Sequence, residues 1–487
     1  MTTPYQVSPA QRRGAAFLAF SLFTVFALVA QRGGVRLSFD SYYYMEYAKQ
    51  FRLHPPESFG SAWPFGWPLL GSATGVLGLS AYQGLLICAW LSILGLIVMV
   101  AGVLAWDKLG LAAGALVLGS GAGTFILTAL VSGVLSEVPF ALSLLAFALC
   151  LARWPEPGAI MASAGLALLT FTLRYAGALA LVMLGGWFLL NFRPLQTAGR
   201  LRLALLAVGM AGLAAIALLS WNLVVIGGFS GHVPGGHVPA SEWLGIASDL
   251  GWSMPAAMGG IGFRDALGFG TSLRLPLGFA FLGIILVLAG YAWQRGVTPA
   301  SRAIGAVTFS YAAGLIALRC YNSFDSLYNA RMFVPLLFPL LVLAAQHFPS
   351  RRLLVMGCAA MLGLNAILCF RGASLQIGAD TRAALPVIAR ATSRDCIAAN
   401  DHALTLSAYT NAQVMRLPLP RWPRPSEGME SCRFIVVCAP PLDRQGHSAR
   451  LAPEWETFIS GVLEKGGYTA RLRTPTLVVL ERIDGTR

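Results

Sequence analysis

Long apolar segments recur through the first 370 residues of the chain, and they restrict its fold more than any other feature. A helix that crosses a bilayer needs roughly 20 apolar residues. The 487-residue chain is 56% hydrophobic and only 11% charged, whereas soluble domains are about 25% charged. We therefore predict a polytopic all-α membrane bundle of about 11 helices. The expected spans are 14–31, 82–105, 109–131, 137–153, 158–173, 175–192, 203–226, 276–294, 303–320, 332–347 and 353–370.

One apolar stretch, 159–192, decides how these spans alternate. It is interrupted only by Arg174, and as a single helix it would be about 50 Å long, far longer than a bilayer is thick. Two shorter spans that meet at Arg174 fit the membrane. They also return the basic segment 193–202 to the same side as the other basic connections.

Basic residues mark alternate connections, which predicts the orientation of the chain. Short loops rich in Lys and Arg stay in the cytoplasm, so we expect the N-terminus inside and the C-terminal part outside. The net charge of +14 then reflects topology and contacts with lipid headgroups or phosphate, and we expect no nucleic-acid partner. The first span has no small-residue cleavage site, so we expect it to be retained. The inner basic residues are Arg12, Arg13, Lys108, Arg153, Arg193, Arg200, Arg202, Arg295, Arg302, Arg351 and Arg352.

The composition changes near residue 370, and we predict a domain boundary there. Residues 1–371 form the membrane domain, and 372–487 form a small extracytoplasmic α/β domain. Helical patterns near 380–392, 402–412 and 453–466 alternate with strand-like segments at 396–400, 433–438 and 476–480. Cys396 and Cys432 each fall at the start of a strand. A disulfide between them requires those strands to be parallel neighbours, and the sequence leaves this open because Cys438 is a further candidate.

The segment 32–81 is the most unusual connection, because it combines charge with aromatic rings. It carries Asp40 and Glu46 just beyond the first span, where an acidic residue is costly unless it has a partner or a function. Four tyrosines accompany them, at positions 42, 43, 44 and 47, and tyrosine suits a membrane–water boundary. We interpret this segment as the catalytic loop of a membrane enzyme. The alternative is an ordinary interfacial loop with an aromatic belt.

Other ionisable residues are expected at the same outer face. Each has an ordinary explanation by itself: Glu137 suits a helix N-terminus, and Arg174 can extend its guanidinium to the interface. Together, a carboxylate and several arginines suggest a base opposite an anion, since the planar guanidinium matches phosphate oxygens. The residues of this outer set are Asp40, Glu46, Glu137, Arg174, Arg264, Arg274, Arg319, Asp325 and Arg331.

The outer loop 227–275 is rich in glycine and proline, and we expect it to be mobile and to cover a site. It contains His232 and His237. A metal site needs a defined ligand set, and no third ligand accompanies these histidines. We therefore predict no metal and no other cofactor.

Four short segments resemble, in order, motifs of the C-type glycosyltransferases (GT-C). These multispanning enzymes use polyprenyl-phosphate sugars and include the protein O-mannosyltransferases and the lipid A aminoarabinose transferases. Residues 39–48 (FDSYYYMEYA), followed by 63–70 (WPFGWPLL), resemble their first outer loop. Residues 136–140 (SEVPF), 171–175 (FTLRY) and 328–339 (YNARMFVPLLFP) resemble three later motifs. Asp40–Ser41 departs from the Asp-Glu and Asp-x-Asp patterns of some members, and Met332 replaces a usual Tyr.

The resemblance implies a transferase that moves a hexose or pentose from a polyprenyl-phosphate donor to an acceptor hydroxyl of a glycan, lipid or protein. Asp40 would be the general base of an inverting, metal-independent displacement at the outer face of a bacterial plasma membrane. The expected substrate-binding residues are Tyr43, Tyr44, Glu46, Glu137, Arg174, Arg319 and Arg331.

Two other functional classes remain open at this stage. A transporter or flippase would also place ionisable residues in a helix bundle, but it typically shows inverted repeats and broken helices at mid-membrane, and the sequence shows no repeat. A polymerase or ligase of lipid-linked glycans has a similar profile. An assembly protein would need none of the four motifs.

Overall fold

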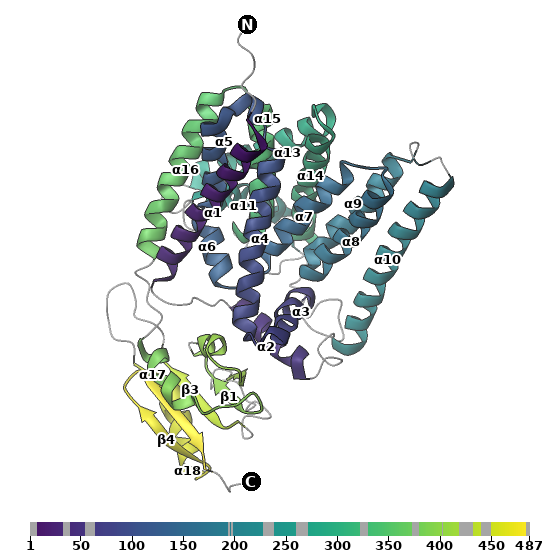
Figure 1. The fold of residues 1–487 in the computed structure, drawn as a ribbon. Helices are drawn as coiled ribbons and strands as arrows, with labels where there is room; N and C mark the ends of the chain where they lie inside the picture. The colour runs from purple at the N-terminus through teal and green to yellow at the C-terminus, as the bar shows by residue number, and fades with distance from the viewer. Residues whose placement is uncertain are drawn as a thin grey trace.

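The computed structural model of the protein describes residues 7–32, 39–53, 64–192, 195, 198–226, 238–259, 271–321, 330–372, 379–401, 403–417, 432–439 and 450–483. Most of these residues form a helical bundle, with a small sheet domain at one end (Figure 1). The bundle is built from α1 (Pro9–Gln31), α4 (Ala81–Val103), α5 (Trp106–Ala122), α6 (Phe125–Ser132), α7 (Glu137–Leu151), α8 (Pro157–Leu173), α9 (Ala178–Leu190), α10 (Ala198–Ile226), α13 (Thr271–Arg295), α14 (Pro299–Tyr321), α15 (Val334–His347) and α16 (Arg351–Gly372).

The length and composition of these helices confirm a polytopic membrane bundle. Among the described residues, seven helices are long and apolar enough to cross a membrane. The pair α5 and α6, bent by 46°, makes an eighth candidate, and three shorter apolar helices complete the set. These elements correspond to the predicted spans. The predicted break is also present, because α8 ends at Leu173 and Arg174 adopts an extended backbone, with φ −153° and ψ 137°.

Three helices lie where the sequence suggested loops. They are α2 (Phe39–Leu53), α3 (Gly66–Ala73) and α11 (Trp243–Gly259), and short 3-10 turns η2 (Thr74–Leu77) and η5 (Ala240–Glu242) accompany the last two. The expectation of a long outer loop over 227–275 is therefore wrong for its middle part, where α11 packs against α13. The charges of α2 and Pro255 inside α11 obscured the helical pattern.

The C-terminal domain holds a five-stranded sheet in the order β2-β1-β3-β5-β4. Strand β1 is parallel to β2 and β3, whereas β5 is antiparallel to β3 and β4. The strands are β1 (Cys396–Ala399), β2 (Gln413–Arg416), β3 (Phe434–Cys438), β4 (Tyr468–Arg473) and β5 (Leu477–Arg482), with helices α17 (Ala379–Ile388) and α18 (Pro453–Glu464). The three predicted strands and the first and last predicted helices are confirmed.

The edge strands β2 and β4 were missed, because both are short or partly exposed and lack a continuous apolar run. The predicted helix over 402–412 is only a 3-10 turn, η7 (Leu404–Ala408). A disulfide joins Cys396, at the start of β1, to Cys432, just before β3. The parallel pairing of β1 with β3 brings these two cysteines together, as the sequence required for a bridge.

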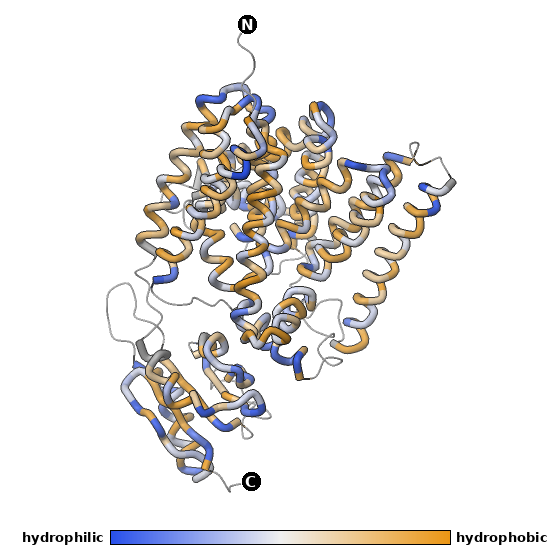
Figure 2. Tube along the Cα trace, in the orientation of Figure 1, coloured by the Kyte–Doolittle hydropathy of each residue, from blue (hydrophilic) through white to orange (hydrophobic). Residues whose placement is uncertain are grey.

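The two ends of the bundle differ. The start of α1 lies at one end, which we call the N-terminal end, whereas α2, α3 and the sheet domain lie at the other (Figure 1). Hydrophobic residues dominate the middle of the helices, and hydrophilic residues gather toward their ends (Figure 2). At the N-terminal end, Lys108 Nζ donates to the carbonyl of Gln346 over 2.7 Å and Arg302 Nε donates to the carbonyl of Gly296 over 2.9 Å. We refer to the opposite end as the α2 end.

Candidate active site

Two carboxylates and two guanidiniums meet at the α2 end of the bundle. Asp40 lies in the first turn of α2, and its Oδ2 is 2.6 Å from Arg331 Nη2. Arg331 lies in the 3-10 turn η6 (Ala330–Phe333) that precedes α15. Its Nε also donates to Glu137 Oε1 over 2.6 Å. Arg331 therefore bridges a carboxylate of the bundle to the carboxylate of α2.

Arg174 is the second guanidinium of this cluster. Its Nη1 lies 2.7 Å from Glu137 Oε1 and 3.3 Å from Ser136 Oγ. Ser136 Oγ is in turn 2.9 Å from the hydroxyl of Tyr44. Because Tyr44 is one turn after Asp40 on α2, the contacts form a closed ring that starts and ends on α2. We call Asp40, Tyr44, Ser136, Glu137, Arg174 and Arg331 the ionic ring.

The turn before α7 sets the positions of Ser136 and Glu137. Val134 adopts a left-handed backbone with φ 48°, which is unfavourable for a β-branched residue. Its carbonyl accepts a 2.6 Å hydrogen bond from the indole of Trp67, which is fully buried. Gly66 packs so closely that an added Cβ would lie 2.8 Å from the carbonyl oxygen of Thr172. Helix α3 thus holds this strained turn against the end of α8.

The arginine of the break is held in a similar way. Arg174 follows α8 directly and precedes the 3-10 turn η3 (Tyr175–Gly177). Gly177 allows the chain to fold back, since a Cβ there would lie 2.3 Å from the carbonyl oxygen of Thr170. The close turn directs the guanidinium toward Glu137.

The side chains of the ionic ring differ in how much of their surface is exposed to solvent. The side chain of Glu137 is 1% exposed and that of Arg174 is 15% exposed, whereas those of Asp40 and Arg331 are 19% and 24% exposed. A buried carboxylate is stable when it is paired and hydrogen-bonded, and Glu137 Oε1 has two arginine partners. Its other oxygen, Oε2, receives no hydrogen bond within the described part of the chain. The ring therefore opens to its surroundings on the side of Asp40 and Arg331.

Three of the predicted binding residues, Tyr43, Glu46 and Arg319, lie outside the ring. Tyr43 stacks on Tyr47 with ring centroids 6.3 Å apart, and it contacts Arg416 of the sheet domain. Glu46 is buried, and it contacts Lys49 and the sheet domain. We correct its assignment: residues six positions apart lie about 120° apart around a helix, so Glu46 and Asp40 point in different directions.

The remaining predicted residues are placed as follows. Arg319 is 6% exposed at the last turn of α14, the helix that also carries Tyr311. His232, His237, Arg264 and Asp325, and the side chain of Arg274, lie outside the described residues. Sequence reasoning did not single out Ser136, which belongs to the ring, or Lys49, which pairs with Glu46. Ser136 precedes Glu137 in a quoted motif, and that adjacency was the available signal.

No three His, Cys, Asp or Glu side chains gather as a metal site requires, within the ranges that the structure describes. The charges that oppose the carboxylates of the ionic ring are guanidiniums. Metal-independent chemistry stays a prediction.

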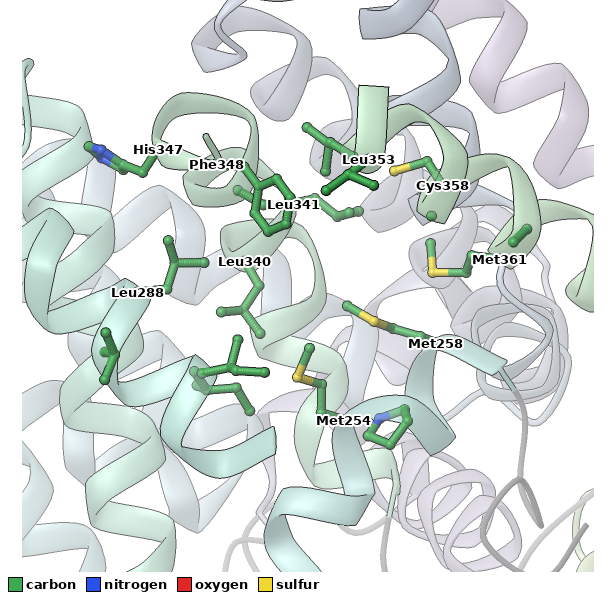
Figure 3. A pocket seen from close by; sticks show the side chains of 18 of the residues that line it. Met254, Met258, Leu288, Leu340, Leu341, His347, Phe348, Leu353, Cys358 and Met361 are labelled. Carbon is green, nitrogen blue, oxygen red and sulfur yellow. The ribbon is translucent and has the colours of Figure 1, made fainter. Parts of the chain in front are cut away.

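An apolar groove of about 960 Å³ lies between α11, α13, α15 and α16. Figure 3 shows its lining, in which Met254, Met258, Leu340 and Leu341 face the same space. Part of its wall is exposed at the surface of the bundle, as at Val287, which is 71% exposed. Helix α11 also packs against η6, the turn that carries Arg331, so this one helix lines the groove and contacts that turn.

Comparisons with known proteins identify the fold. No protein-family model and no curated protein sequence matches the chain. The crystal structure of ArnT from Cupriavidus metallidurans bound to undecaprenyl phosphate aligns with a TM-score of 0.50 at 14% identity, over 97% of this chain and 98% of that chain. The archaeal oligosaccharyltransferase AglB from Archaeoglobus fulgidus, in complex with an inhibitory peptide and a dolichol-phosphate, aligns with a TM-score of 0.40 at 11% identity, over 86% of this chain and 69% of that chain. The match to ArnT spans nearly the whole of both chains and confirms the expected GT-C fold.

Proposed function

We propose that this protein is an integral membrane glycosyltransferase that moves a sugar from a polyprenyl-phosphate donor to an acceptor hydroxyl. The ionic ring carries the proposal. It combines a partly exposed carboxylate, Asp40, with two guanidiniums that a buried carboxylate, Glu137, holds at fixed positions. The crystallised ArnT, whose fold is shared, is bound to undecaprenyl phosphate, which agrees with a lipid-linked phosphate donor.

Asp40 is the proposed general base. Its carboxylate takes the proton of the acceptor hydroxyl while the hydroxyl oxygen attacks the anomeric carbon. The bond from that carbon to the phosphate oxygen breaks, and the polyprenyl phosphate leaves with the electron pair. A single displacement inverts the anomeric centre. The transition state resembles an oxocarbenium ion, so the same carboxylate also stabilises developing positive charge.

The guanidiniums of Arg174 and Arg331 are proposed to hold the phosphate. Arginine binds phosphate through paired N–H donors and keeps its charge at any working pH. The two carboxylates and two guanidiniums of the ring are together formally neutral, so a bound phosphate adds net negative charge. We assign Arg319, which is buried on α14, as the additional cation. Glu137 then acts by fixing the arginines rather than by touching the sugar.

The apolar groove is the proposed site of the polyprenyl chain. Its lining is mostly aliphatic or thioether, with the aromatic residues Tyr291, His347 and Phe348 among its members, which suits an isoprenoid chain and offers few partners to a polar ligand. Helix α11 connects it to the ionic ring through its contact with η6. A donor that lies along α11 would have its phosphate at the arginines and its lipid tail between the helices.

The expected orientation follows from the charges of the two ends. Basic connections such as those of Lys108 and Arg302 lie at the N-terminal end, and the ionic ring lies at the α2 end. The positive-inside rule then puts the N-terminus in the cytoplasm and the ring at the outer face of a bacterial plasma membrane. No nucleotide sugar is available on that side, which fits a lipid-linked donor.

The decisive experiment uses the purified protein, a polyprenyl-phosphate sugar and a membrane extract as the source of acceptors. We expect the wild type to release polyprenyl phosphate and to label an acceptor. The Asp40→Asn variant should lose about 100- to 10,000-fold in turnover and keep its affinity for the donor. Asp107→Asn is the matched control, because Asp107 is an exposed acid in the first turn of α5.

Each outcome discriminates between functional classes. Normal turnover by a well-folded Asp40→Asn protein would exclude the proposed mechanism. Movement of the intact lipid-linked saccharide across a vesicle membrane, without bond cleavage, would indicate a transporter or flippase. Growth of the donor-linked glycan itself would indicate a polymerase or ligase.

A further inference from the structure

Two faces of helix α2 contact different parts of the protein. Asp40 and Tyr44, four residues apart, join the ionic ring. Tyr42, Glu46 and Lys49 follow one another at spacings of four and three residues, and they lie on another face. All three contact the sheet domain. A short helix therefore touches the bundle on one side and the C-terminal domain on another.

The contact with the sheet domain is a network of buried hydrogen bonds. Lys49 Nζ lies 2.8 Å from Glu46 Oε1, and it donates to Ser407 Oγ over 3.2 Å and to the carbonyl of Ala412 over 2.8 Å. Ser407 also donates to Glu46 Oε1. The other oxygen of Glu46 accepts the backbone N–H of Val414 over 2.9 Å. The side chains of Lys49 and Glu46 are only 7% and 9% exposed.

The same contact completes the edge of the sheet. Strand β2 is the edge strand beside β1, and an edge strand leaves backbone N–H and C=O groups without a neighbouring strand. The backbone N–H of Val414 donates a hydrogen bond to Glu46. The carbonyl of Val414 accepts a 2.6 Å hydrogen bond from the hydroxyl of Tyr42. Side chains of α2 thus replace a sixth strand at this position.

A buried ion pair of this kind destabilises the folded state when its charges lack further hydrogen bonds. Taking two charges out of water is repaid only when geometry and further hydrogen bonds are good. Here the further hydrogen bonds come from Ser407, Ala412 and Val414 of the sheet domain. A 15-residue helix alone is marginal in water, so α2 needs neighbours to be ordered, and it packs against α3 and α4 of the bundle as well as against the sheet domain.

We propose that the C-terminal domain is a positioning element of the active site, which holds α2 through Tyr42, Glu46 and Lys49 and thereby keeps Asp40 in the ionic ring. Glu46 lies six residues from Asp40, about 9 Å along a rigid helix. A shift of α2 at the sheet domain is therefore transmitted to Asp40. The proposal rests on the proposed function of Asp40. Its structural half, the dependence of α2 on the sheet domain, is independent of any reaction.

The test compares Lys49→Met, Glu46→Gln and the double variant. Each single change leaves a buried polar group without its charged partner, whereas the double change removes both charges. We expect each single variant to lose about 10- to 100-fold in kcat, since small misplacements of reacting groups have effects of that size. The KM for the donor should stay within about threefold of that of the wild type. The double variant should recover at least about half of the lost activity on a logarithmic scale.

Hydrogen exchange of the backbone amides of α2 is the second readout. Exchange across residues 40–53 should accelerate in both single variants and slow again in the double variant. Glu456→Gln is the control, because it breaks a similar pair with Arg473 that is about half exposed and lies between α18 and β4. It should change neither exchange in α2 nor kcat.

The two readouts separate the possible failures. Unchanged exchange of α2 in Lys49→Met would overturn the positioning role, whatever the activity. Faster exchange with an unchanged kcat would show that α2 docks on the sheet domain without positioning Asp40, and would also overturn the proposal. If the wild type itself does not use a polyprenyl-phosphate sugar, the proposed function fails. The exchange data then still decide whether the sheet domain orders α2.

Discussion

Arg331 Nη2 lies 2.6 Å from Asp40 Oδ2, although 291 residues separate the two in the chain. The same guanidinium contacts Glu137, so one arginine links helix α2 to the start of α7. This arrangement brings the proposed base next to a proposed phosphate ligand. Both carboxylates and both guanidiniums of the ring therefore depend on one another for charge compensation.

Glu137→Gln should destabilise the bundle and impair donor binding together. The change removes the charge that Arg174 and Arg331 share, and breaking a buried pair costs about 3–5 kcal/mol. Thermal unfolding of the purified protein in one detergent measures the loss. Glu456→Gln breaks an exposed pair and should cost about 0–1 kcal/mol. Equal stability of these two variants would contradict the role that we give to Glu137.

Replacement of the arginines by lysine should weaken donor binding although the charge is kept. Arg331 contacts two different carboxylates through its planar fork, and a lysine ammonium is a single point charge. We expect Arg331→Lys and Arg174→Lys to raise the dissociation constant for polyprenyl phosphate by about 10-fold or more. Arg319→Ala should have a similar effect.

Binding of fluorescent polyprenyl phosphate measures this constant without turnover. Arg302→Lys is the control, since Arg302 lies at the N-terminal end and contacts only a backbone carbonyl among its described hydrogen bonds. If Arg331→Lys, Arg174→Lys and Arg319→Ala all bind polyprenyl phosphate with unchanged affinity, these arginines do not form the phosphate site.

Loss of the disulfide should destabilise the sheet domain. Cys396 and Cys432 are 36 residues apart in sequence, and closing a loop of that length restricts the unfolded chain by about 3–4 kcal/mol. We expect the double variant Cys396→Ser, Cys432→Ser to unfold its sheet domain at a lower denaturant concentration. A reductant should shift the wild type toward the variant and leave the variant unchanged. A reductant-insensitive wild type would show that the bridge is not formed.

The stability of the sheet domain should also fall in acid because of Asp395. Burial alone would raise the pKa of this carboxyl, but hydrogen bonds from Thr392 and the nearby Arg433 guanidinium outweigh burial and lower the pKa below its ordinary value. The folded state then binds this proton less tightly than the unfolded chain does. The ionised Asp395 carboxylate therefore stabilises the folded domain above the ordinary Asp pKa of about 3.9. This stabilisation is lost as the pH falls through the lowered pKa of the folded state.

Asp395→Asn provides the measurement. The variant should be less stable than the wild type near neutral pH, and the difference should shrink below about pH 3.9. Denaturation followed at several pH values tests this. A difference that is constant across the range would mean that the carboxylate does not contribute through its charge.

The orientation of the chain is tested by a reporter fused after Arg371, at the end of α16. The proposed topology puts this point outside the cytoplasm. We expect a periplasmic reporter such as a secreted phosphatase to be active there, and a reporter that works only in the cytoplasm to be inactive. The opposite pair of results would reverse the topology and leave the fold unchanged.

Hydropathy predicted the bundle well, because a bilayer imposes a length on each span. The break at Arg174 was also predictable, since no membrane accommodates a helix as long as 159–192. Helix α2 was missed as a helix because several of the residues that it contacts, such as Ser407 and Val414, lie far away in sequence. Periodicity within one segment carries no information on such partners.

The candidate site was predicted in part. Asp40, Tyr44, Glu137, Arg174 and Arg331 were selected from short motifs, and the structure brings them into one ring. Glu46 was assigned to the same site because it shares a segment with Asp40. Proximity in sequence is misleading on a helix, where the face decides the neighbours. The strained turn at Val134 and the hydrogen bond from Trp67 that holds it depend on tertiary packing and leave no pattern in the sequence.

The ionic ring has a consequence for biosynthesis. Glu137 is made early, but one of its two guanidinium partners, Arg331, is made only after a further 194 residues. Until the ribosome has delivered η6 and α15, Glu137 lacks one of its two guanidinium partners and Asp40 lacks the guanidinium of Arg331. The ionic ring is consequently among the last parts of the membrane domain to be completed.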